Sequence, residues 1–135
     1  MTTAVDTNIL IHVLSDDAVF AVRSRDGLGT ASGRGRLIVC DVVIAELGGF
    51  VSEVDDLSEF LRDLGLDYVP TSLAAAATAG RLRSDYRHAG GSRRRAVADF
   101  LIAAHAMSEA DSLLTRDTDL QQMSLGDLEV LVPEA

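Results

Sequence analysis

Short apolar runs alternate along this chain with longer stretches in which apolar residues recur every three or four positions. Four runs are short and apolar enough to be buried strands, at residues 2–5, 36–40, 66–70 and 112–115, and residues 128–132 form a candidate fifth. Parallel strands need long crossover connections, which are usually helical. The alternation therefore predicts an α/β fold, with helices covering both faces of a central, mainly parallel sheet of four to five strands.

The stretches between these runs predict helices. We expect them at residues 7–14, 16 or 17–25, 42–52, 54–64, 71–88 and 93–110. Leu57, Leu61 and Leu64 share one side of the fourth helix, which Gly65 would end, and Asp41 is expected to cap the third. Ahead of the second strand, four glycines predict a loop: Gly27, Gly29, Gly33 and Gly35.

The overall composition is that of a folded domain. A chain of 135 residues, 47% of them hydrophobic, can bury a core as a single domain spanning residues 1–135. No apolar run is long enough to cross a bilayer, and no basic segment precedes an apolar run at the start, so we expect neither a membrane span nor a signal peptide. Cys40 is the only cysteine, which fits a core position in a protein of the reducing cytoplasm.

Four acidic residues stand where charges are unexpected. Asp6 and Asp117 follow apolar strands, whereas Glu46 and Asp99 interrupt apolar helices. Each alone has an ordinary explanation, as a helix cap or as the polar edge of a helix that faces water. Together they are candidates for one cluster, because right-handed crossovers can bring such positions to one edge of a parallel sheet.

A cluster of carboxylates needs a positive charge, since like charges packed together repel each other. Carboxylate oxygens without cysteine suit Mg²⁺ or Mn²⁺ rather than zinc. Such ions can activate water and stabilise the oxygens of a phosphoryl group during displacement. The three histidines, His12, His88 and His105, have no neighbours typical of a catalytic triad and are interpreted as core or surface residues.

The net charge limits the kinds of molecule that the chain can bind. The formal net charge is −9, and all twelve basic residues are arginines, so bulk attraction to nucleic acid is excluded. Half of them lie in residues 81–95, where Asp85 is the only acid. This segment is either a solvated face or a contact for RNA phosphate, with Arg87, Arg93 and Arg94 as the candidate RNA-binding residues.

The arginines before Asp99 have a second feature. If Ser92 caps the next helix, Arg93, Arg94 and Arg95 occupy its first turn, where each positive charge opposes the helix dipole by about 0.3–1 kcal/mol. An anionic group would offset that cost. Phosphate, the acidic site itself and an acidic segment of a partner are the candidates.

Four segments, in this order, resemble PIN-domain ribonucleases, and specifically the VapC toxins of bacterial and archaeal toxin–antitoxin operons. They are residues 5–10 (VDTNIL), 43–47 (VIAEL), 95–106 (RAVADFLIAAHA) and 114–117 (LTRD). The resemblance implies a three-layer α/β/α fold and RNA hydrolysis by metal-activated water, dependent on Mg²⁺ or Mn²⁺, without a covalent enzyme intermediate.

The resemblance also assigns roles to residues. It makes Asp6, Glu46, Asp99 and Asp117 the catalytic, metal-binding acids, with Asp6 and Asp99 as the principal ligands. Asn8 and Thr115 would support the acids by hydrogen bonding, and Asp119 would be an auxiliary acid. A large aromatic often follows the last acid in this family, whereas Leu120 stands here, which we interpret as a packing variant.

As partners, the resemblance implies an RNA substrate, a VapB-type antitoxin, operator DNA reached only through that antitoxin, and a second copy in a homodimer. Two alternatives keep the same fold: a PIN nuclease of RNA processing or repair outside toxin biology, and a non-catalytic acidic α/β interaction module. A haloacid-dehalogenase-like phosphatase would need an acid where Asn8 stands.

Overall fold

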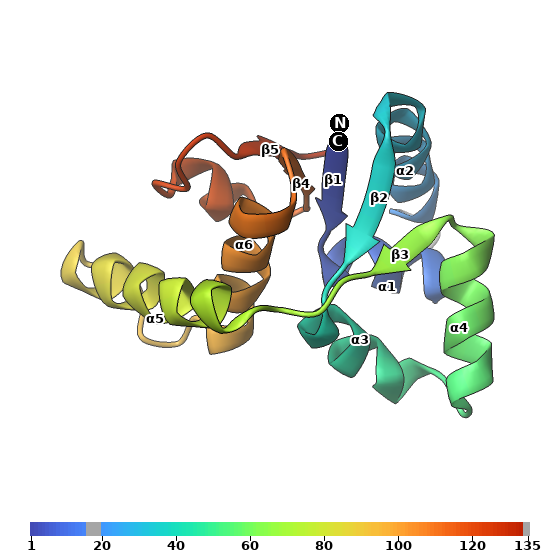
Figure 1. Ribbon diagram of the computed structural model, residues 1–135, viewed down its shortest axis with the longest axis horizontal. Coiled ribbons are helices and arrows are strands. Elements are labelled where there is room, and N and C mark those ends of the chain that lie inside the picture. Colours follow the sequence, from blue (N-terminus) through green and yellow to red (C-terminus); the bar gives the residue numbers. More distant parts are fainter. Residues whose placement is uncertain (16–19, 134–135) are drawn as a thin grey trace.

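The computed structural model describes residues 1–15 and 20–133, and within them a five-stranded sheet forms the centre of the molecule (Figure 1). Its strands are β1 (Thr2–Val5), β2 (Arg36–Val39), β3 (Leu66–Tyr68), β4 (Ser112–Leu114) and β5 (Glu129–Leu131). Every neighbouring pair is parallel, in the order β3-β2-β1-β4-β5. The predicted α/β class and the candidate fifth strand are confirmed.

Six α-helices and two short 3-10 helices in the described residues connect the strands. They are α1 (Thr7–Leu14), α2 (Ala21–Arg34), α3 (Asp41–Leu47), α4 (Val54–Asp63), α5 (Leu73–His88) and α6 (Val97–Glu109), with η1 (Gly48–Phe50) and η2 (Thr118–Gln122). In Figure 1, α1 and α2 lie on one side of the sheet and α6 on the other, with α5 packed against α6. The result is the expected three-layer α/β/α arrangement.

The order in which the chain adds strands to the sheet reverses at β1. The chain passes from β1 to β2 and β3 on one side, then returns to β4 and β5 on the other. In open parallel sheets, ligands bind beyond the carboxyl ends of the strands at such a switch point. A backbone hydrogen bond of 2.9 Å from Asp6 N to Leu114 O joins β1 to β4 at that edge.

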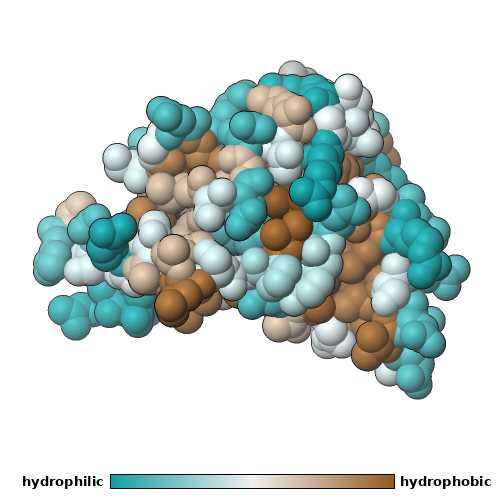
Figure 2. Space-filling view, viewed as in Figure 1, coloured by the Kyte–Doolittle hydropathy of each residue, from teal (hydrophilic) through white to brown (hydrophobic). Residues whose placement is uncertain are grey.

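The core lies between the sheet and its helices. β1 and β4 are buried on both faces, and their polar residues Thr3 and Ser112 are buried with them and share a side-chain hydrogen bond of 3.0 Å. Leu120 is also buried, in keeping with its interpretation as a packing variant, and so is Cys40. Figure 2 shows hydrophobic surface near α3 and α4, where Phe50 and Val54 are exposed. Within the described residues, no helix has both the length and the apolar character needed to span a membrane.

The predicted glycine loop at residues 27–35 is wrong, because α2 runs through most of it to Arg34. The predicted helix start at residue 16 or 17 lies outside the described residues. Leu28 and Ala31 are buried in the core, and Gly27 lies against the side chain of Pro133, where a Cβ would be 3.2 Å from Pro133 Cγ. Packing therefore outweighs the low helix propensity of glycine here.

The prediction that Ser92 caps the last helix is also wrong. α6 begins at Val97 after Ala96, and the preceding arginines lie in a turn. Ser92 Oγ accepts a hydrogen bond from Arg94 N at 3.1 Å within that turn. Arg93, Arg94 and Arg95 therefore lie outside the first turn of α6 and do not oppose its dipole there.

Smaller differences concern α3. It begins at Asp41 and gives way to η1 after Leu47, earlier than predicted. Asp41 is not the cap: its Oδ1 accepts hydrogen bonds from Thr71 N at 2.9 Å and Thr71 Oγ1 at 2.6 Å, so it ties α3 to the start of the next crossover.

Candidate functional site

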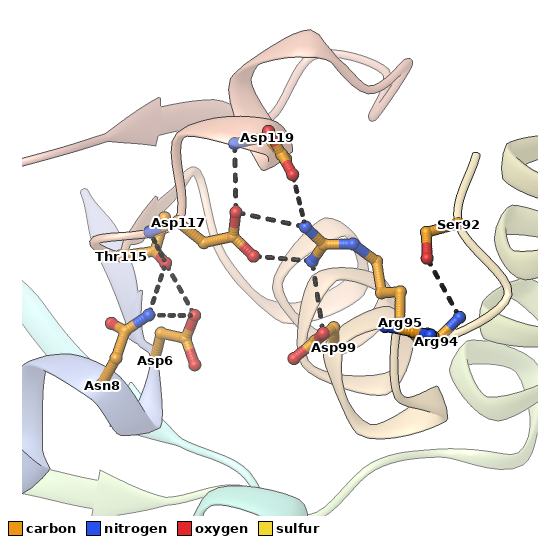
Figure 3. A network of polar contacts seen from close by, with 9 residues as sticks. All are labelled: Asp6, Asn8, Ser92, Arg94, Arg95, Asp99, Thr115, Asp117 and Asp119. Carbon is orange, nitrogen blue, oxygen red and sulfur yellow. Dashed lines mark hydrogen bonds and ion pairs between the residues drawn. The ribbon is translucent and has the colours of Figure 1, made fainter. Parts of the chain in front are cut away.

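Asp6 stands at the end of β1, with its side chain turned toward the end of β4 (Figure 3). It occupies the N-cap position of α1, yet its side chain makes no capping hydrogen bond within the described residues. Its Oδ2 instead accepts hydrogen bonds from Thr115 Oγ1 at 2.7 Å and Asn8 Nδ2 at 3.4 Å. Thr7 is the first helical residue, and its Oγ1 donates to Glu46 Oε1 at 2.6 Å. Asp6 is thus held as part of a site rather than as a helix cap.

Thr115 and Asn8 link the ends of the two central strands. Thr115 is buried, and its Oγ1, which donates to Asp6, also accepts hydrogen bonds from Asp117 N at 3.0 Å and Asn8 Nδ2 at 3.4 Å. Asn8 Oδ1 accepts from Arg116 N at 3.0 Å. These two polar residues therefore orient Asp6 and Asp117 at the same edge.

The electrostatics show that the acids share one environment. Burial raises the pKa of Asp6 to about 6, the hydrogen bond from Thr115 opposes that rise, and Asp99 and Glu46 add to it. Burial also raises the pKa of Asp99; Arg95 opposes this, and the charges of Asp117 and Glu46 add to it. Since acids far apart in water do not influence each other in this way, all four belong to one cluster.

Arg95 lies between two of these acids, Asp99 and Asp117, and neighbouring Asp119, and it is the residue whose role the sequence did not reveal. Its Nη1 donates to Asp117 Oδ2 at 2.6 Å and to Asp99 Oδ2 at 3.2 Å. Its Nη2 donates to Asp119 Oδ2 at 2.9 Å and to Asp117 Oδ1 at 3.4 Å. The one local signal in the sequence was the spacing of four residues between Arg95 and Asp99, which places an opposite charge within reach.

The other candidate residues take different positions. Arg93 and Arg94 are exposed in the turn before α6, and Arg87 is half-buried near the end of α5. Asp117 both lies in the cluster and caps η2, since its Oδ1 accepts from Asp119 N at 3.0 Å. His105, by contrast, is a core residue hydrogen-bonded to Val69 O at 2.7 Å.

The chemistry of the cluster fits a hard divalent cation. Its donors are carboxylate oxygens, and the guanidinium of Arg95 shows that this edge holds a positive charge. Among the described residues, no three acidic, histidine or cysteine side chains already converge on a single point. Asp6 and Glu46 have no arginine partner among the described residues, whereas Arg95 engages Asp99 through one oxygen and also Asp117 and Asp119; all of these carboxylates could contribute oxygen ligands to an ion.

The profile of the PIN domain matches residues 3–125. The chain belongs to the PIN-domain family. The match covers β1 through η2 and so includes all four acids and Arg95. No curated protein matches the sequence.

Solved structures share the fold at low sequence identity. A chain of VapBC2 from Rickettsia felis, bound to a DNA fragment from its promoter, has a TM-score of 0.77 at 19% identity, covering 99% of this chain and 100% of that one. A chain of DNA-bound VapBC from Salmonella typhimurium has a TM-score of 0.68 at 20% identity, covering 98% of each. VapBC-5 from Mycobacterium tuberculosis has a TM-score of 0.60 at 24% identity, covering 97% and 98%. This PIN domain therefore has the fold of chains in toxin–antitoxin complexes.

Proposed function

We propose that the chain, as a single PIN domain, is a divalent-metal-dependent endoribonuclease and the toxin of a VapBC-type pair. The observation that carries the proposal is the cluster at the switch point, where acids from separate elements come together and burial raises the pKa of Asp6 to about 6. Arg95 supplies a positive charge to Asp99, Asp117 and Asp119, but among the described residues no arginine pairs with buried Asp6, and a buried carboxylate without a cation is costly, so the arrangement favours ion binding over a purely structural role.

The acids of the cluster would have different roles as ligands of the ion. Asp6 and Asp99 are the principal ligands, with Glu46 and Asp117 completing the set and Asp119 as an auxiliary acid. Bound Mg²⁺ or Mn²⁺ supplies activation of water and neutralisation of charge on the phosphoryl oxygens. Thr115 fixes one oxygen of Asp6 by its hydrogen bond and leaves the other for the ion.

A covalent route through the protein is less suitable. Cys40 is buried and its pKa is raised by burial, so its thiol is a poor nucleophile. His105, in the core, is hydrogen-bonded to a backbone carbonyl rather than to a nucleophile. Direct hydrolysis by water is therefore the mechanism we propose.

The substrate would be RNA, contacted by Arg93, Arg94 and Arg87 beside the acids. The first two are exposed in the turn that leads to α6, five and six residues before Asp99, and they directly precede Arg95 of the cluster. Arginine binds phosphate oxygens well, because its planar fork offers paired donors. An acidic chain needs such a local patch to hold RNA at all.

The toxin assignment rests on the fold of VapBC complexes and on charge. A chain with a net charge of −9 favours a basic partner, and the antitoxin would be that partner. The Rickettsia and Salmonella complexes are bound to DNA. Here operator DNA would be reached through the antitoxin, because the toxin itself is acidic, and we propose that two copies of the chain form a homodimer.

The decisive experiment combines metal binding with RNA end mapping. Mg²⁺ or Mn²⁺ should raise the melting temperature of the purified protein, because a ligand of the native state stabilises it. Brief expression should generate new RNA ends. Asp6→Asn and Asp99→Asn should remove both effects, whereas Asp63→Asn, an exposed acid at the end of α4, should remove neither. Retention of both effects in the Asp6 and Asp99 variants would disprove the site.

Growth separates the toxin from a PIN nuclease of RNA processing. Expression of the wild type alone should arrest growth, and co-expression of a small DNA-binding protein encoded beside it should restore growth. Cleavage of RNA without growth arrest would favour a processing enzyme. Absence of both cleavage and metal binding would favour an interaction module.

A further inference from the structure

The side chain of Arg95 is held in place rather than free in solvent. Only 11% of it is exposed, and it makes hydrogen bonds to three different carboxylates (Figure 3). Its guanidinium lies over the ring of Tyr86, with Cζ 5.6 Å from the ring centroid. Tyr86 in turn packs edge-on against buried Phe100, so the support extends into the core. A surface arginine in a basic patch would not be fixed in this way.

The contacts of Arg95 divide the acidic cluster into two sides. On one side, Asp117 and Asp119 are paired with the guanidinium, and Asp99 touches it with one oxygen, Oδ2. On the other side, Asp6 accepts hydrogen bonds from neutral groups, the hydroxyl of Thr115 and the amide of Asn8. In the described residues, no arginine forms an ion pair with Asp6 or Glu46.

We propose that Arg95 is a built-in counter-ion that competes with divalent metal for the Asp99–Asp117 side of the cluster. The first ion would enter the side left without a cation, at Asp6, Asp99 and Glu46. A further ion could use Asp117 only after the guanidinium had released it. This inference rests on the proposed metal-dependent function, and it makes Arg95 a positioning residue, which acts through the acids.

The geometry explains why an arginine suits this role. A guanidinium can donate to several carboxylate oxygens at once, whereas an ammonium acts as a point charge. Without metal, these contacts hold Asp99, Asp117 and Asp119 together against their mutual repulsion. With metal, the same positive charge repels the ion and occupies its ligands. Arg95 therefore stabilises the metal-free protein and weakens metal binding.

The test measures Mn²⁺ binding by titration calorimetry, and melting temperature in the presence of a chelator, for the wild type, Arg95→Gln and Arg95→Lys. Arg81→Gln is the matched control, since Arg81 is exposed on α5 and its loss changes the net charge equally. Arg95→Gln should bind Mn²⁺ roughly tenfold more tightly, or bind an additional ion, and should melt at a lower temperature without metal. Arg95→Lys should fall between it and the wild type, and Arg81→Gln should match the wild type.

Three results would overturn the inference, each in a recognisable way. Equal Mn²⁺ affinity and stoichiometry in wild type and Arg95→Gln would show that Arg95 does not compete. Weaker binding in Arg95→Gln would show that Arg95 merely builds the site. Absence of Mn²⁺ binding in every protein, the wild type included, would instead refute the proposed metal-dependent function and this inference with it. If Arg95→Gln does not fold, Arg95→Lys alone decides, because it keeps a charge but cannot make the same set of contacts.

Discussion

At the scale of single residues, Asp6 bears the largest electrostatic cost of the site. Burial raises its pKa from 3.8 to about 6, so the folded protein keeps this proton at a pH where the unfolded chain has lost it. The native state therefore binds more protons between about pH 4 and pH 6, and its stability falls as the pH rises through that window. Above about pH 6 the free-energy cost of burying the ionised Asp6 carboxylate is constant, and a bound metal ion can compensate for it.

Asp6→Asn should consequently stabilise the metal-free protein at neutral pH. A pKa change of this size corresponds to about 3 kcal/mol at most. The gain over the wild type should be absent near pH 4, grow up to about pH 6 and then stay level, because Asn carries no charge and can still accept the hydrogen bond from Thr115. Urea unfolding in a chelator at several pH values checks this.

The control for that experiment is Asp41, whose pKa is shifted the other way. Hydrogen bonds from Thr71 lower the pKa of Asp41. The ionised carboxylate of Asp41 therefore stabilises the folded protein above about pH 4, and this stabilisation is lost as the pH falls. Asp41→Asn should consequently be less stable than the wild type at neutral pH. If Asp6→Asn and Asp41→Asn both raised, or both lowered, the free energy of unfolding at neutral pH, the electrostatic interpretation would be contradicted.

Thr115 connects the two central strands through its buried hydroxyl. Its buried hydroxyl donates to Asp6 and accepts from Asp117 N. Thr115→Val should lower the free energy of unfolding by about 1–3 kcal/mol, because both partners lose a hydrogen bond inside the protein. Thr115→Ser keeps the hydroxyl and should lose much less. Urea denaturation of the three proteins measures the difference, and equal losses would show that packing rather than hydrogen bonding matters.

The residues of the cluster differ in how far the sequence revealed them. Glu46 and Asp99 were visible because a lone charge in an apolar helix is unusual. Arg95 was not, because it stands beside Arg93 and Arg94 and the three look alike in sequence. Its main partner, Asp117, lies 22 positions away, and only folding brings the two together.

At the scale of elements, the strands were easier to predict than the turns. β1 and β4 lie in short runs without charged residues that end in apolar side chains, which is typical of strands buried on both faces. The part of α2 beyond Arg25 was missed because its glycines signal a loop. It packs at Gly27 against Pro133, which is distant in the sequence, so the contact forms only on folding. The turn before α6 was also missed, because the approach of Gly91 to Tyr86 and the ion pair of Arg95 with Asp117 form only in the folded chain.

That turn depends on a close approach of Gly91 to Tyr86. A Cβ at Gly91 would lie 2.5 Å from the carbonyl oxygen of Tyr86, and nearer still to its ring. Gly91→Ala should therefore displace the turn and cost about 1–3 kcal/mol of stability. Gly80→Ala is the matched control, since nothing lies within 4 Å of a Cβ there and alanine favours a helix by up to about 1 kcal/mol. Urea unfolding should show a lower free energy of unfolding for Gly91→Ala and a higher one for Gly80→Ala. An unchanged free energy in Gly91→Ala would contradict the close packing.

At the scale of the whole molecule, charge is distributed unevenly. The chain carries −9 in total, yet half of its arginines lie in residues 81–95, around the outer end of α5 and the turn that follows. Figure 2 shows hydrophilic surface over that outer end. Because Arg95 is engaged by the acids, Arg93 and Arg94 are the exposed cations next to the cluster. An acidic molecule with one basic edge should bind an anionic polymer at that edge and repel it elsewhere.

The dependence of RNA binding on salt tests this arrangement. For single-stranded RNA, each phosphate contact contributes about 0.7 to the slope of log affinity against log salt. Changing Arg93 and Arg94 together to Ala should reduce the slope by about 0.7 to 1.4 and weaken binding most at low salt. Arg62→Ala, an exposed arginine in the last turn of α4, is the control and should leave the slope unchanged. Binding is measured in a chelator so that RNA stays intact. An unchanged slope in the double variant would assign these arginines to the solvated face, leaving recognition of RNA to another surface.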